Sequence, residues 1–173
     1  MVELIVEMIF AVLVIALDVV IVMHLLRGAP YLPTHRESVA KMIELAQVRP
    51  ADKMVDLGSG DGRIVIAFAK QGIEAHGYEV NPLLVWWSRK NIQRAGLDGR
   101  AFIHRQSFWR ADFSSYSIVT IFGITHIMKG LEKKLQKELA PGARVISNAF
   151  RFPNWKLNEK KGAVMLFELT DNG

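Results

Sequence analysis

The chain has 173 residues, no cysteine and a formal net charge of +5 at pH 7. This length suits one domain of ordinary size with a hydrophobic core. Without cysteine, disulfides and thiolate metal sites are excluded, and the five histidines follow no metal-binding spacing. We therefore expect no metal.

Residues 4–26 read LIVEMIFAVLVIALDVVIVMHLL and are almost wholly apolar. At about 1.5 Å per residue, a helix of this length crosses a hydrocarbon core about 30 Å thick. Glu7 lies near one end, whereas Asp18 lies deeper, where a charge costs about 3 kcal/mol. We expect residues 1–27 to form a membrane anchor with one transmembrane helix. A buried core helix or an amphipathic surface helix is the alternative.

The charge of the chain is unevenly distributed. All 22 Lys and Arg residues follow residue 26, with 14 of the 17 acids, so this part has a net charge of +8. The basic residues directly after the apolar run, such as Arg27 and Arg36, predict that the rest of the chain lies on the cytoplasmic side. A basic surface suits anionic headgroups or nucleic acid, or it is simply solvated.

Residues 28–34, GAPYLPT, are expected to be a linker that covers the active site, because Pro30 and Pro33 interrupt a continuous helix. Thr34 and Glu37 have the spacing of a capping box, so Thr34 is predicted to cap a helix that ends near residue 47. Residues 35–173 then form the cofactor-binding domain.

Helix and strand patterns alternate through this domain. The expected strands are 53–57, 75–80, 101–105, 117–122, 143–150 and 163–169. The expected helices are 62–71, 81–95 and 127–139. This order predicts an α/β, Rossmann-like fold, with a mostly parallel sheet, helices on both faces and an antiparallel final strand. On the helix over 81–95, we expect Leu83, Val85 and Trp86 to lie in the core.

The stretch VDLGSGDGR, residues 55–63, joins the first of these strands to a helix. Its glycines follow a GxGxG pattern, and Arg63 stands where a dinucleotide fingerprint has its third glycine. No GK[ST] follows, so ATP is not supported. Asp56 would repel phosphates but suits a cationic cofactor, and S-adenosylmethionine carries an ammonium and a sulfonium. The carboxylate of that cofactor can use backbone N–H groups at the helix start.

Glu79 strengthens this interpretation. It ends the second strand 21 residues after Gly58, where a carboxylate can accept both ribose hydroxyls.

VDLGSGDGR and GYEVNP are similar to motifs of the class I, seven-β-strand, S-adenosylmethionine-dependent methyltransferases. PYLPT, NPLLVWWSR, IVTIFG and LEKKLQKELAPGARVIS resemble a narrower group, over roughly residues 29–155. These are the membrane-anchored protein-lysine methyltransferases related to the mitochondrial ATP synthase c-subunit enzyme, with their archaeal relatives. The resemblance implies an S-adenosylmethionine-dependent protein-lysine N-methyltransferase that acts near a membrane on a lysine side chain of a protein substrate.

The resemblance also implies which residues hold the cofactor. Many members have an acid after the third strand, near the adenine amino group, and Gln106 or Ser107 takes that place here. The implied cofactor-binding residues are Asp56, Leu57, Gly58, Ser59, Gly60, Asp61, Glu79, Val80, Asn81 and Ser107.

Candidates for the substrate-lysine pocket come from two segments. Tyr31 and Thr34 lie in the linker, and Phe122, Gly123 and Thr125 follow the fourth strand. Tyr31 faces the amine, or it anchors the chain at a membrane interface. No side chain stands out as a general base, and a sulfonium and an apolar pocket both lower the pKa of a lysine amine.

Other functions stay open. A methyltransferase of a small molecule or lipid is the enzymatic alternative, and a non-catalytic cofactor-binding scaffold is another. Nucleic acid is not the expected substrate, because FGIT stands where methyltransferases of base amines carry a [DNS]PP[YFW]-like motif.

Overall fold

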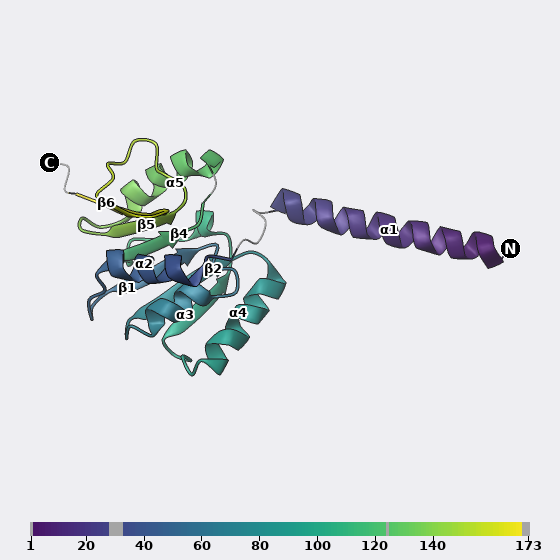
Figure 1. Ribbon diagram of the computed structural model, residues 1–173, viewed down its shortest axis with the longest axis horizontal. Coiled ribbons are helices and arrows are strands. Elements are labelled where there is room, and N and C mark those ends of the chain that lie inside the picture. Colours follow the sequence, from purple (N-terminus) through teal and green to yellow (C-terminus); the bar gives the residue numbers. More distant parts are fainter. Residues whose placement is uncertain (1, 28–32, 124, 171–173) are drawn as a thin grey trace. The chain divides into compact units, whose positions relative to one another are not determined.

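The computed structural model describes residues 2–27, 33–123 and 125–170 (Figure 1). The chain divides into two compact units, Met1–Leu32 and Pro33–Gly173.

The first unit contains α1, Val2–Arg27, which carries the acids Glu3, Glu7 and Asp18. Its exposed large apolar side chains are Ile5, Val6, Met8, Ile9, Phe10, Val12, Leu13, Val14, Ile15, Leu17 and Val20. Among the residues that the structure describes, no helix combines the length and the apolar character that a membrane crossing requires. The transmembrane helix expected over residues 4–26 is therefore not confirmed.

The second unit contains a seven-stranded sheet with the strand order β3-β2-β1-β4-β5-β7-β6. Its strands are β1 Lys53–Leu57, β2 Glu74–Glu79, β3 Ala101–Arg105, β4 Ile118–Ile121, β5 Arg144–Asn148, β6 Glu159–Lys161 and β7 Val164–Glu168. The first five strands are parallel, and β7 runs antiparallel between β5 and β6. The predicted Rossmann-like sheet with an antiparallel final strand is confirmed. The three residues of β6 are too few to give a strand pattern, and the sequence did not predict them.

The helices of this unit are α2 Arg36–Ala46, α3 Arg63–Ala69, α4 Pro82–Arg94 and α5 Thr125–Glu138, with a short 3-10 helix, η1, at Phe108–Arg110. Successive strand residues point to opposite faces of the sheet. Met54 packs in the core that α2, α3 and α4 share, whereas Val55 packs in the core that contains α5. The helices therefore cover both faces, as predicted.

Two local predictions are wrong. The residue that caps α2 is His35, without a side-chain hydrogen bond, so Thr34 does not form the expected capping box. Glu37 instead pairs with Lys41 at 2.6 Å. Leu83 and Trp86 are 71% and 63% exposed, because α4 has only one face against the sheet and both side chains lie on the other.

Candidate functional site

The glycine-rich loop lies where β1 ends and α3 begins. Gly58, Gly60 and Gly62 all have positive φ angles, a backbone conformation that other residues rarely adopt. The backbone N–H groups of Gly58 and Ser59 donate to the carbonyl of Tyr78, at 2.9 and 3.0 Å. The loop is therefore fixed against β2, and the backbone rather than the side chains sets its shape.

Asp56 lies on β1 directly before this loop and is only 2% exposed. Its Oδ1 accepts a hydrogen bond from Thr120 Oγ1 on β4 at 2.7 Å. Burial raises the pKa of the Asp56 carboxyl to about 7, against the lowering effect of the Thr120 hydrogen bond, and the negative charges of Glu79 and Asp61 raise it further. Three carboxyl groups therefore converge at this end of the sheet.

Glu79 ends β2 and closes the loop from the other side. Its Oε2 accepts from the N–H of Gly60 at 3.0 Å, and its Oε1 accepts from the N–H groups of Val80 and Asn81, both at 2.8 Å. Asn81 Oδ1 in turn caps α4 by accepting from Leu83 N at 2.9 Å. This carboxylate is thus held at the predicted place, between the loop and the start of α4.

The structure also shows a connection that the sequence did not reveal. Arg63 Nε and Nη2 donate to the carboxylate of Asp61 at 3.0 and 2.8 Å, and Arg63 Nη1 donates to the carbonyl of Thr34 at 2.9 Å. The residue in the place of a third glycine therefore fastens Thr34, the last residue of the predicted linker, to the glycine-rich loop. An arginine beside an acid in a loop would be the only sequence signal for it.

Two further contacts escaped prediction. Thr120 faces Asp56 because β1 and β4 are neighbours with these residues in register. Gly77 on β2 lies under Ser59, and a Cβ at Gly77 would come within 2.5 Å of the Ser59 Cβ. The strand glycine makes room for the loop, and only the pairing of strands would have indicated either contact.

The carboxyl groups at this end of the sheet suit S-adenosylmethionine as the cofactor. Burial is the main cause of the raised pKa of Asp56, and the negative charges of Glu79 and Asp61 add to it, so a cationic group of the cofactor beside Asp56 would favour its charged form. A Cβ added to Gly58 would meet no atom within 4 Å, so the loop leaves open space on that side. Leu57 and Ser59 are buried, and Val80, next to Glu79 in sequence, is half exposed.

Ser107 lies at the same end of the sheet as Glu79. Arg105, two residues earlier, pairs with Glu79 across β2 and β3. Ser107 precedes η1, and its carbonyl accepts from the N–H of Arg110 at 3.0 Å. Its place suits the predicted adenine contact, which stays a prediction.

The residues of the predicted lysine pocket differ in burial and in packing. Phe122 is partly buried, with its ring 6.1 Å from that of Phe150. Gly123 is buried, and a Cβ there would lie 2.5 Å from Met128 Sδ. Thr125 is exposed and begins α5. Thr34 is buried beside the loop, whereas Tyr31 lies outside the described residues.

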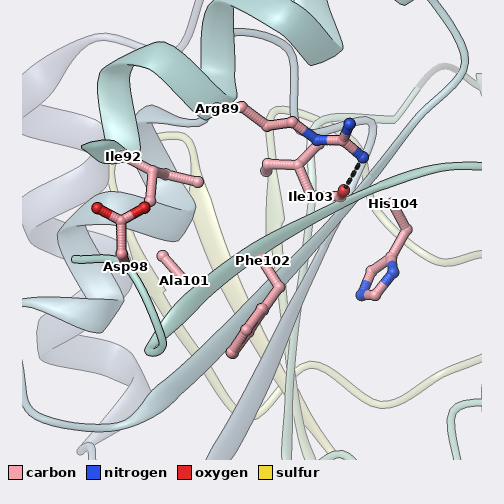
Figure 2. Close-up of a pocket in the computed structure, with 7 residues that line it drawn as sticks. All are labelled: Arg89, Ile92, Asp98, Ala101, Phe102, Ile103 and His104. Atoms are coloured by element: carbon pink, nitrogen blue, oxygen red, sulfur yellow. Dashed lines mark hydrogen bonds between the residues drawn. The ribbon is translucent and has the colours of Figure 1, made fainter. Parts of the chain in front are cut away.

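A hollow of about 250 Å³ lies elsewhere, at the outer edge of β3. Figure 2 shows Arg89 of α4 reaching over this edge, where its Nη2 donates to the carbonyl of Ile103 at 2.8 Å. None of the predicted cofactor residues lines the hollow. Within the described residues, no group of three or more His, Asp or Glu side chains could hold a metal ion.

Comparison with known proteins agrees with this geometry. The family model of the ANTKMT methyltransferase domain matches residues 56–159. The mouse lysine N-methyltransferase of the ATP synthase c-subunit is 46% identical over 133 residues, which are 77% of this chain and 53% of the relative. This chain thus spans about half of the length of that relative. A protein-lysine N-methyltransferase of Saccharolobus islandicus is 40% identical over 132 residues, 75% of this chain and 82% of the relative.

A solved structure resembles the fold closely. The RNA methyltransferase of Salinibacter ruber, in complex with S-adenosyl-L-homocysteine, has a TM-score of 0.76 and 33% identity, over 82% of this chain and 96% of that one. The predicted resemblance to class I methyltransferases and their protein-lysine-modifying members is confirmed. The chain belongs to the family of the ANTKMT methyltransferase domain.

Proposed function

We propose that this chain is an S-adenosylmethionine-dependent protein-lysine N-methyltransferase. The observation that carries the proposal is the archaeal protein-lysine N-methyltransferase, of which 82% aligns with this chain at 40% identity. Asp56 and Glu79 support the choice of cofactor, because the buried carboxyl of Asp56 suits a cationic group and Glu79 ends β2 where a carboxylate can accept ribose hydroxyls.

Methyl transfer requires the protein mainly to orient the cofactor and the substrate amine. When bound, S-adenosylmethionine would supply a methyl group: the amine nitrogen would bond to the methyl carbon as the carbon–sulfur bond breaks, and the sulfur would leave as a neutral thioether. Glu79 would hold the ribose hydroxyls, and Asp56 would offset the positive charge of the cofactor. The substrate amine must be neutral, and its ordinary pKa of about 10.4 falls beside a cation and apolar walls. Phe122 and Gly123 supply such walls at the end of β4, so the enzyme works without a dedicated base.

The test uses S-adenosylmethionine with a tritiated methyl group, the purified full chain and a membrane extract from its host. We expect the label to enter protein, to be released by protease and to hydrolyse to methyl-lysine. A Glu79→Ala chain serves as the control for transfer by contaminating enzymes. Label found in the lipid or small-molecule fraction would contradict a protein substrate and indicate a lipid or small-molecule substrate instead.

RNA is the second candidate substrate, because the Salinibacter ruber structure at 33% identity is that of an RNA methyltransferase. The segment FGIT after β4 favours protein over a base amine. The same labelling experiment decides between them, because counts that ribonuclease removes and protease does not would identify RNA as the substrate.

We further propose that α1 associates with a membrane and keeps the domain on the cytoplasmic side, near lysines of membrane proteins. The apolar side chains of α1 that are exposed occupy successive positions from Met8 to Phe10 and from Val12 to Ile15, so they surround the helix. Such a helix is buried by lipid or by other apolar surfaces. A chain that lacks residues 1–26 should be less abundant in the membrane fraction and methylate its cellular targets less. Equal methylation without α1 would contradict this part of the proposal.

A further inference from the structure

The outer face of α4 carries a stripe that the cofactor site does not use. The stripe consists of Leu83, Trp86, Trp87, Lys90 and Arg94, which recur at helical spacing along one side. Leu83, Trp86 and Trp87 are 71%, 63% and 44% exposed. Val80, directly before the helix, is 47% exposed. Apart from these four, the large hydrophobic side chains that are exposed in the described residues are Trp109 and those of α1.

The opposite face of α4 explains why this stripe stays outside. Val85, Ser88 and Ile92 are buried against the rest of the domain. The core of the domain is therefore built from the inner face, and an outer face with two partly exposed tryptophans indicates a binding surface.

We infer that the α4 stripe docks on a membrane surface that contains anionic lipid. Tryptophan favours the boundary between headgroups and acyl chains, because its ring is apolar and its N–H is polar. Lys90 and Arg94 continue the stripe beyond the tryptophans, and basic side chains in that position bind lipid phosphates. No acid occurs from Val80 to Leu97, so nothing on this helix repels an anionic surface.

Charge favours lipid over a protein partner. The part of the chain after residue 26 has a net charge of +8, which a continuous anionic surface complements as a whole. A protein partner would have to match two bulky indoles and two cations on a single helix face with one local patch of its own.

The contact would orient the active site. α4 is fastened to the cofactor loop, because Asn91 Nδ2 donates to the carbonyl of Asp61 at 3.0 Å. A Cβ at Gly62 would lie only 3.0 Å from the Ser88 Cβ, so helix and loop are also tightly packed. The apolar end of the stripe is the end next to Glu79. Docking would therefore bring the cofactor end of the sheet towards the lipid surface.

This inference extends the proposed function to a second membrane contact, and it is tested without methyl transfer. The full chain is mixed with vesicles of phosphatidylcholine carrying brominated acyl chains, either alone or with about a third of phosphatidylserine. Bromine quenches the fluorescence of tryptophan that enters the interface. The Trp86→Phe/Trp87→Phe chain is compared with Trp109→Phe, which removes the exposed tryptophan outside the stripe.

We expect vesicles with phosphatidylserine to quench the native and Trp109→Phe chains, and Trp86→Phe/Trp87→Phe to lose most of the quenching. Lys90→Gln/Arg94→Gln should lower the preference for anionic vesicles by roughly 10- to 30-fold. Lys156→Gln/Lys160→Gln, which removes two exposed lysines elsewhere, should change it less than about threefold.

Quenching that survives in Trp86→Phe/Trp87→Phe would overturn the inference, as would equal effects of the two charge pairs. A fluorescence change with acidic polypeptides but none with vesicles would overturn it in favour of a protein partner. Methyl transfer in detergent, without vesicles, should be equal in all of these chains. Its absence would instead refute the proposed function and leave the vesicle result standing.

Discussion

The two halves of the site are built differently. The cofactor half is held by backbone groups, as Glu79 accepts three N–H bonds and the loop donates two to Tyr78. The predicted lysine half combines Thr34 with Phe122, Gly123 and Thr125. Phe122 and Gly123 follow β4 and make packing contacts with Phe150 and Met128. Methyltransferases that share a cofactor need the first geometry in common, whereas the second must change with each substrate.

The largest effect is expected in the cofactor half, from Glu79→Ala. This change removes the proposed ribose contact and leaves the N–H groups of Gly60, Val80 and Asn81 without their acceptor. Hydrogen bonds to a charged group contribute about 1.5–3 kcal/mol each, so we expect cofactor affinity to fall about a hundredfold. Calorimetric titration with S-adenosylhomocysteine measures this affinity. Glu44→Ala, which removes an exposed acid on α2, should bind normally. Unchanged affinity in a folded Glu79→Ala chain would contradict the cofactor assignment.

Arg63→Gln tests the connection between the two halves. It breaks the paired contact with Asp61 and the hydrogen bond to the Thr34 carbonyl. Thr34 should then lose its contact with the loop, and kcat/KM for the protein substrate should fall about 10- to 30-fold. Cofactor affinity should change less, because Asp56 and Glu79 stay in place. Arg151→Gln, an exposed arginine after β5, is the control. A loss confined to cofactor affinity would show that Arg63 serves the loop alone.

The contrast between the halves also explains what could be predicted from the sequence. Asp56, the glycines and Glu79 form short local patterns, and their places at the ends of β1 and β2 follow from the order of strands alone. Thr120 and Gly77 are brought to the site by strand pairing, and no local sequence pattern predicts their contacts. Arg63 and Thr34 are 29 positions apart, so no local pattern predicts their hydrogen bond either. The prediction that Trp86 lies in the core is wrong for a related reason, because an apolar residue on a helix does not by itself indicate which face of the helix packs against the sheet.

A smaller effect, in the cofactor half, depends on pH. Burial raises the pKa of Asp56 to about 7, and a cationic cofactor binds better to the charged form. The affinity of the native chain for S-adenosylmethionine should therefore rise by up to about tenfold per pH unit below about pH 7. Above that value the affinity should level off. Asp56→Asn should bind weakly at every pH, with a flat profile. Asp98→Asn, which changes an exposed acid, should keep the native profile.

The same raised pKa has a consequence for the stability of the cofactor-free chain. The folded chain holds this proton up to about pH 7, whereas the unfolded chain loses it near pH 4, so the Asp56 contribution to stability falls as pH rises between these values. Asp56→Asn should thus raise the free energy of unfolding more at about pH 8 than at about pH 5, as urea denaturation would measure. A native chain whose affinity and stability ignore pH in this window would refute the electrostatic role of Asp56.

The smallest effect is expected in the lysine half, from Gly123→Ala. The new Cβ would lie 2.5 Å from Met128 Sδ, so the side chain of Met128 or the backbone at residue 123 must shift to relieve the contact. A shift there should lower kcat about fivefold and leave cofactor affinity unchanged, because the loop of Gly58 to Gly62 is untouched. Gly130→Ala on α5 is the matched control, since its Cβ would make only an ordinary contact, 3.4 Å from Trp109. If Gly123→Ala instead weakened cofactor binding as strongly as kcat, the two halves would share one support and their separation would be wrong.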